Sequence, residues 1–139
     1  MYDVFISYRQ CEPDKSWVRK TLYPALENAG LKVFIDFKHF RIAAPVITEM
    51  ERGVEESRYT LAVVTPLYLE STFTEFENLI SQHLGLEKSE HRLIIIVRES
   101  CELSLRLRYK LWLEMKNEED FLDNLPRLIE TLKQPAAHS

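Results

Sequence analysis

The apolar run at residues 4–6 (Val-Phe-Ile) constrains the fold of this chain more than any other feature, because polar residues bound it on both sides. Such a run is typical of a strand buried on both faces, as in a parallel sheet covered by helices. It ends at Ser7, Tyr8 and Arg9. Open α/β sheets bind ligands in the crevice at the carboxyl ends of their strands. The spacing alone leaves two interpretations open: these residues line a crevice, or they only begin a solvated loop.

Strand-like and helix-like segments alternate along the chain. Trp17, Val18 and Leu22 recur at helical spacing, and Asp14 is the expected N-cap of their helix. Alternation of this kind predicts right-handed βαβ units and a parallel sheet. We expect strands at residues 3–7, 31–36, 59–64, 92–97 and 110–113, and helices at residues 14–28, 46–56, 72–84 and 118–132.

The length and composition limit the class of protein. A chain of 139 residues suffices for one domain but not for two, and we expect a domain at 1–133 with a disordered tail at 134–139. The net charge of -4 argues against the basic surface that binds nucleic acid. Cys11 and Cys101 are too few for a disulfide framework, and no Cys/His cluster indicates a metal. No apolar run reaches the length of a membrane span. We therefore expect a cytoplasmic protein that binds neither membrane nor metal.

Several common α/β sites are absent from the sequence. Gly30, Gly53 and Gly85 fall at helix ends or within a helix, so no Gly-rich loop is present to cradle phosphates. The first and third expected strands end in Ser7-Tyr8 and Thr65-Pro66 rather than in the acidic residues of a phosphate-accepting receiver domain. No Gly-x-Ser-x-Gly turn indicates a hydrolase of the α/β type.

One carboxylate lacks a structural explanation. Thr72 and Glu75 fit a capping box at the start of the helix 72–84. Glu77 has no cation three or four residues away, and it borders the apolar face that Phe73 and Ile80 define. Partial burial there would raise its pKa and favour a role in a reaction or in ligand binding. The alternative is a solvated glutamate, or one paired with a distant arginine.

In order and spacing, segments across nearly the whole chain resemble a Toll/interleukin-1 receptor (TIR) domain of the bacterial, NAD+-cleaving branch. They are YDVFISY at 2–8, WV at 17–18, GLKVFID at 30–36, VEESR at 54–58 and LAVVTP at 61–66. The resemblance implies a flavodoxin-like sheet of five parallel strands in the order 2-1-3-4-5, with helices on both faces. It also aligns Ser71, Phe73 and Glu77 with the family's Ser-x-Trp-x-x-x-Glu segment, so that Phe73 replaces the usual Trp.

By this resemblance Glu77 is the catalytic glutamate that cleaves NAD+, which is a substrate and not a bound cofactor. The nicotinamide of NAD+ is a cationic pyridinium and departs neutral, so no general acid is needed. Glu77 would hold the ribose hydroxyls and stabilise the oxocarbenium charge. The expected substrate-binding residues, with Arg9 as the partner of the diphosphate, are Tyr8, Arg9, Asp36, Phe37 and Phe73.

The products would be nicotinamide and either ADP-ribose or a cyclic isomer, in nucleotide signalling or antiphage immunity by analogy. A loop from Phe37 to Pro45 carries Phe40 and Ile42, which we expect to be exposed, and it would mediate association with other TIR domains. Many relatives have a glycine near Ala43-Ala44-Pro45, so this loop departs from the family pattern. The alternative function is a non-catalytic scaffold that acts through TIR–TIR contacts, as many animal receptor and adaptor members do.

Overall fold

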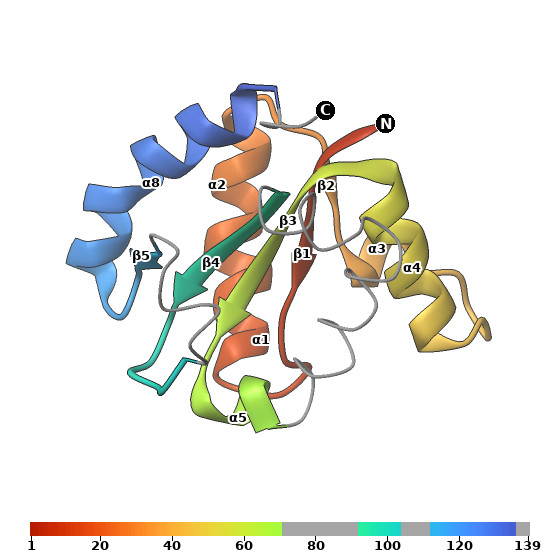
Figure 1. Cartoon of the computed structure of the whole chain (residues 1–139), viewed down its shortest axis with the longest axis horizontal. Helices are drawn as coiled ribbons and strands as arrows, with labels where there is room; N and C mark the ends of the chain where they lie inside the picture. The colour runs from red at the N-terminus through yellow and green to blue at the C-terminus, as the bar shows by residue number, and fades with distance from the viewer. Residues whose placement is uncertain (71–91, 104–111, 136–139) are drawn as a thin grey trace.

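The computed structural model describes residues 1–70, 92–103 and 112–135 (Figure 1). The expected helix 72–84, with its capping box, Phe73 and Glu77, lies outside these residues.

Five strands form one sheet in the order β2-β1-β3-β4-β5, and every adjacent pair is parallel (Figure 1). This confirms the predicted flavodoxin-like α/β fold. The central strand is almost wholly buried, as its apolar sequence predicts. The strands are β1 (Tyr2–Ser7), β2 (Val33–Phe34), β3 (Ser57–Val64), β4 (Leu93–Val97) and β5 (Leu113–Glu114).

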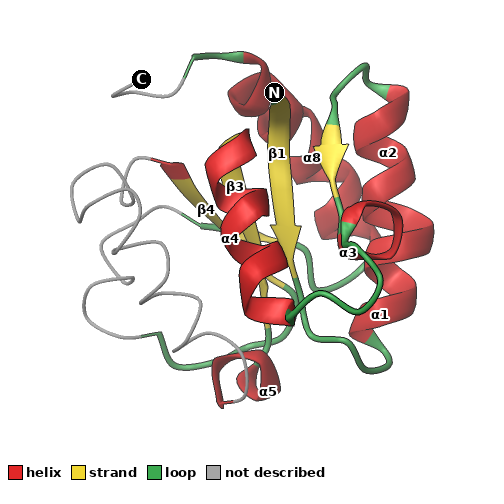
Figure 2. Cartoon of the chain, turned by 90° about the vertical axis from the view of Figure 1, so that its right-hand side faces the viewer, coloured by secondary structure: helices red, strands yellow, loops and turns green. Residues whose placement is uncertain are grey.

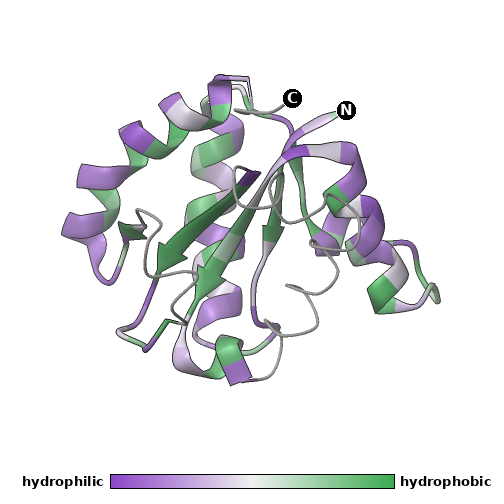
Figure 3. Cartoon of the chain, in the orientation of Figure 1, coloured by the Kyte–Doolittle hydropathy of each residue, from purple (hydrophilic) through white to green (hydrophobic). Residues whose placement is uncertain are grey.

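Helices cover both faces of the sheet. On one face lie α1 (Asp14–Trp17), which continues through a π-helical segment (Val18–Leu22) into α2 (Tyr23–Asn28), and α8 (Glu118–Lys133). On the other face lies α4 (Val46–Glu56), whereas α5 (Pro66–Tyr68) lies beyond the carboxyl ends of the strands with Tyr68 buried in the core on that side. Figure 2 shows α4 and the pair formed by α2 and α8 on opposite sides of β1. Hydrophobic residues concentrate on the strands (Figure 3), which is why the sheet forms the core between two helical layers.

The packing of α4 depends on a glycine. A Cβ at Gly53 would lie 2.8 Å from the ring of Phe5, so only glycine lets α4 approach β1 this closely. Gly30 after α2 has φ +89, as the sequence predicts for the end of that helix.

Three expected details of the elements are wrong. Asp14 is not the N-cap of the first helix, because Pro13 holds that position and the Asp14 carboxylate is buried against Thr65. The second strand is shorter than 31–36, since Asp36 begins a short helix, α3 (Asp36–His39). The last strand is Leu113–Glu114 and begins after Trp112.

At the amino edge of the sheet, the start of β1 is held to the end of α8 (Figure 1). Arg58 donates to Asp3 (2.9 Å) and to the carbonyl oxygens of Leu132 (2.7 Å) and Gln134 (2.7 Å). The Tyr59 hydroxyl donates to the Pro135 carbonyl at 3.1 Å. The first two residues of the expected tail are thus anchored, and the other four lie outside the described residues.

Candidate functional site

A pocket of about 620 Å³ opens at the carboxyl end of β1. This edge is where open α/β sheets bind ligands, and the strand order reverses between β1 and β3. The volume suits a small-molecule site. The polar part of its wall comprises Ser7, Tyr8, Arg9, Gln10 and Asp36, and the apolar part includes Phe5, Phe40, Val46 and Met50.

A polar cluster joins three elements beside this pocket. The Tyr8 hydroxyl, after β1, donates to Asp36 Oδ1 at 2.5 Å, and Asp36 begins α3. Arg19, from the first helical layer, donates through Nε to the Tyr8 oxygen (2.8 Å) and through Nη2 to Asp36 Oδ2 (3.1 Å). Burial, with the Asp36 carboxylate as acceptor of its proton, raises the pKa of Tyr8 to about 12. Tyr8 therefore stays a neutral hydroxyl, and Asp36 faces a cation.

Arg9 differs from Arg19 in its surroundings. It is half-buried and lines the pocket. Within residues 1–70, 92–103 and 112–135, no hydrogen bond or ion pair engages its guanidinium. With respect to these described residues, its donors can bind an anionic group that enters the pocket from solvent.

A second, fully buried network meets the pocket at Ser7. Ser7 and Tyr68 share a hydrogen bond of 2.9 Å between their hydroxyl oxygens. The Thr65 hydroxyl oxygen accepts from the Tyr68 backbone N–H (3.1 Å), and the same hydroxyl donates to Asp14 at 3.3 Å. Burial raises the pKa of the Asp14 carboxyl. These contacts fix the carboxyl ends of β1 and β3, and with them the position of Ser7 in the pocket wall.

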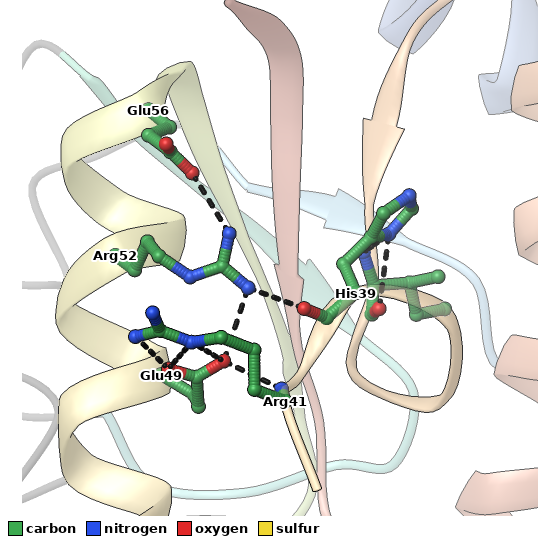
Figure 4. A network of polar contacts seen from close by, with 6 residues as sticks. His39, Arg41, Glu49, Arg52 and Glu56 are labelled. Atoms are coloured by element: carbon green, nitrogen blue, oxygen red, sulfur yellow. Dashed lines mark hydrogen bonds and ion pairs between the residues drawn. The ribbon is translucent and has the colours of Figure 1, made fainter. Parts of the chain in front are cut away.

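An ionic network fastens the segment after α3 to α4 (Figure 4). Glu49 on α4 accepts from the Arg41 backbone N–H (2.6 Å) and from Arg41 Nη2 (2.8 Å). Arg52 donates to Glu49 (3.0 Å) and to the carbonyl oxygen of His39, and it pairs with Glu56. The hydrogen bonds from Arg41 and Arg52 lower the pKa of Glu49 to about 2. The loop that follows α3 therefore has a fixed anchor on α4.

The loop between α3 and α4 presents the apolar side chain of Ile42 to solvent. Ile42 is 99% exposed, which confirms that part of the prediction. Phe40 was expected to be exposed, and this expectation is wrong: its ring packs against Phe5 and Phe34, with centroid distances of 6.2 Å to each. Ala43 has φ +68, in the left-handed region that favours glycine.

The structure thus brings Tyr8, Arg9 and Asp36 to one pocket. Phe37 is not on the described pocket wall. It lies edge-on to Tyr23 at a centroid distance of 5.5 Å and beneath the Arg19 guanidinium at 4.8 Å. Sequence reasoning missed Arg19, because a cation on an amphipathic helix has the pattern of a solvated residue. Glu77 and Phe73 lie outside the described residues, so their positions relative to this pocket stay predictions.

Comparison with known proteins identifies the family. A family model for the TIR domain matches residues 4–129. The chain belongs to the TIR-domain family. The TIR domain of the Toll-related receptor TRR-2 from Hydra magnipapillata has the same fold, with a TM-score of 0.78, 24% identity and coverage of 96% of this chain and 100% of that one. A prokaryotic SEFIR domain superposes with a TM-score of 0.73 at 20% identity, over 94% of this chain and 92% of that one.

Curated relatives of this TIR domain carry two kinds of name. The NAD(+) hydrolase TirS of Staphylococcus aureus is 33% identical over 95 residues, which cover 68% of this chain and 32% of TirS. Human Toll-like receptor 6 is 24% identical over 98 residues, 70% of this chain and 12% of the receptor. The chain thus spans a third or less of these relatives. The relatives' names thus include both a hydrolase and a receptor.

The described parts of the chain contain neither a metal-binding cluster nor a membrane-spanning helix. No group of three or more His, Cys, Asp and Glu side chains there is arranged to hold a metal ion. No helix of the described residues is long and apolar enough to cross a membrane.

Proposed function

We propose that this TIR domain is an NAD+ nucleosidase that cleaves the bond between nicotinamide and ribose. The observation that carries the proposal is the pocket at the end of β1, where Tyr8, Arg9 and Asp36 meet in a chain 33% identical to a protein named as an NAD(+) hydrolase. The guanidinium of Arg9, which lines this pocket, suits the diphosphate of NAD+. The aromatic and apolar wall suits its bases.

Glu77 is the proposed catalytic residue. A carboxylate beside the ribose would stabilise the oxocarbenium charge that develops as the neutral nicotinamide departs. Phe73 would pack against the nicotinamide or the ribose. Phe37, placed beneath Arg19, would support the substrate site from behind.

The test measures nicotinamide released from NAD+ by the purified protein at high concentration. Glu77→Gln keeps the shape of the side chain and removes its charge, so turnover should fall by orders of magnitude while Tm stays within the range of surface changes. Glu70→Gln is the matched control, because Glu70 is an exposed glutamate that precedes the same segment. Phe73→Ala should reduce binding and rate less severely. A Glu77→Gln protein that works at the parent rate would contradict the catalytic assignment.

The finer parts of the proposal concern product and setting. Attack by water on the oxocarbenium would give ADP-ribose, and attack by another hydroxyl of the same molecule would give a cyclic isomer. Chromatography of the reaction mixture separates the two. We place this activity in cytoplasmic nucleotide signalling of an antiphage or innate-immune kind. Cys11 and Cys101 are free thiols, which suits a reducing compartment.

A scaffold function is the second candidate, and the loop tip favours it. Ile42 is apolar and exposed, so its burial against a partner would favour association. We propose that the loop from Phe37 to Pro45 contacts another TIR domain. Sedimentation of the parent and of Ile42→Ala over a range of concentrations tests this, since only the parent should form larger species. Identical sedimentation, with activity strictly proportional to concentration, would exclude the loop contact.

A further inference from the structure

We infer that Arg19 is a positioning residue of the pocket. It holds Tyr8 and Asp36 so that both present hydrogen-bond acceptors to the hydroxyl groups of a bound sugar, while the Tyr8 hydroxyl presents no donor. This rests on the proposed function, because NAD+ is the ligand that would bring those hydroxyls. Arg19 lies beside the pocket and acts through Tyr8 and Asp36.

Three of the five N–H donors of Arg19 are engaged by groups of the described residues. Its Nε donates to Tyr8, and its Nη2 donates to Asp36 and, at 3.2 Å, to the side-chain oxygen of Gln10. The ring of Phe37 covers one face of the guanidinium. A guanidinium whose Nε and Nη2 bridge Tyr8, Asp36 and Gln10 fixes the orientation of these neighbours. Arg9, which has no such partners among the described residues, remains the group for the diphosphate.

The engaged donors determine what Tyr8 can offer. Its single proton goes to Asp36 Oδ1, and one lone pair of its oxygen accepts from Arg19. The hydroxyl therefore has an acceptor site left and no donor. A neutral phenol is the state that burial favours here.

Asp36 retains capacity after both contacts. Tyr8 occupies one site on Oδ1 and Arg19 one on Oδ2, whereas a carboxylate has about four acceptor sites. Asp36 lines the pocket, with its side chain 15% exposed. The acceptor sites that Tyr8 and Arg19 do not occupy can accept from two hydroxyls of one sugar, which is the arrangement that a vicinal diol requires. The fork of Arg19 and the Tyr8 hydroxyl fix the plane of the carboxylate for that contact.

Binding of two probes tests the inference without any turnover. ADP-ribose carries both a diphosphate and ribose hydroxyls, and inorganic pyrophosphate carries the anion alone. Arg19→Gln should weaken ADP-ribose about tenfold and leave pyrophosphate unchanged, whereas Arg9→Gln should weaken both. Arg19→Lys keeps the charge but cannot bridge Tyr8 and Asp36, so it should behave like Arg19→Gln. Arg127→Gln, at an exposed arginine of α8, is the matched control and should change neither affinity.

A double-mutant cycle tests whether Arg19 acts through Asp36. Once Asp36→Asn has removed the carboxylate charge, Arg19→Gln should cost ADP-ribose binding little more. Additive losses would overturn the inference, as would an equal loss of pyrophosphate affinity in Arg19→Gln or a lower Tm with ADP-ribose affinity intact. Failure of the parent to bind ADP-ribose would overturn it too. A parent that binds ADP-ribose but releases no nicotinamide would contradict the proposed reaction and leave this inference supported.

Discussion

Two carboxylates near the same edge of the sheet, Glu49 and Asp36, are each held by arginine, and they differ in how fully they are used. Glu49 is 1% exposed and accepts from the backbone and guanidinium of Arg41 and from Arg52 (Figure 4). Asp36 is 15% exposed, accepts from Tyr8 and Arg19, and lines the pocket. The first is enclosed by its own protein, whereas the second still faces an open space.

The difference shows that the role of a paired carboxylate depends on how many of its hydrogen-bond acceptor sites remain unoccupied. The Glu49 network closes the loop after α3 onto α4, so its contacts serve the fold. Loss of one partner there leaves buried groups unpaired, which is the costly case. The Asp36 cluster is partly solvated, and its ion pair contributes less to stability. Its remaining acceptor sites are available to a ligand.

The largest effect on stability should come from Glu49→Ala. The substitution removes the common acceptor of Arg41 and Arg52, so Tm should fall by several degrees in a thermal scan followed by circular dichroism. Glu130→Ala in α8, at an exposed glutamate, is the control and should change Tm little. Equal Tm values for the two variants would show that the Glu49 network does not stabilise the fold.

Asp36→Asn should affect ligand binding more than stability, the reverse of what we expect for Glu49→Ala. Asparagine keeps the size of the side chain but loses the charge that attracts Arg19 and the second strong acceptor. We expect a smaller fall in Tm than in Glu49→Ala and a KM for NAD+ raised about tenfold. A fall in Tm as large as that of Glu49→Ala, with KM unchanged, would give both carboxylates the same structural role.

The sequence predicts the two regions unequally, for a physical reason. The apolar run at residues 4–6 and the strand at Leu93–Val97 predict the sheet, because a strand buried on both faces must be apolar throughout. Tyr8, Arg9 and Asp36 could be placed at one edge, since carboxyl ends of parallel strands meet there. Their predicted role in substrate binding stays a prediction.

Other contacts were not predictable from periodicity. Arg19 and Glu49 lie on helices, where paired and solvated charged residues occur at the same sequence spacing. Only the tertiary structure distinguishes a buried charge from a solvated one. Asp14 has the sequence position of a cap, but its carboxylate instead bonds Thr65, 51 residues away. Phe40 has the position of a loop residue, and the aromatic pair of Phe5 and Phe34 draws it inward.

Acid should weaken the Glu49 network in a defined window. The pKa of Glu49 is about 2 in the folded protein, below its ordinary 4.5. Its contribution to stability is therefore fully present above about pH 5 and is lost as the pH falls from 4.5 toward 2. The gap in Tm between the parent and Glu49→Gln should narrow between pH 6 and pH 3. Burial raises the pKa of Asp14, so the contribution of Asp14 to stability changes with pH in the opposite direction. The parent and the variant both contain Asp14, so this contribution cancels in the difference between their Tm values. A gap that widens in acid would contradict the assignment.

The smallest effect should come from Ala43→Gly, at the tip of the loop that Glu49 anchors. Ala43 has φ +68, where an L-residue pays about 1 kcal/mol that glycine does not. Glycine also makes the unfolded chain more flexible, which offsets part of that gain. We expect a rise in Tm of a few degrees at most, with KM for NAD+ unchanged, because the substitution leaves the Asp36 cluster intact. Ala44→Gly is the matched control: no positive φ is relieved there, so only the flexibility remains and Tm should fall slightly. If Ala43→Gly lowers Tm as Ala44→Gly does, the left-handed tip is not a strained feature of the free protein, and the Glu49 network alone sets the conformation of the loop.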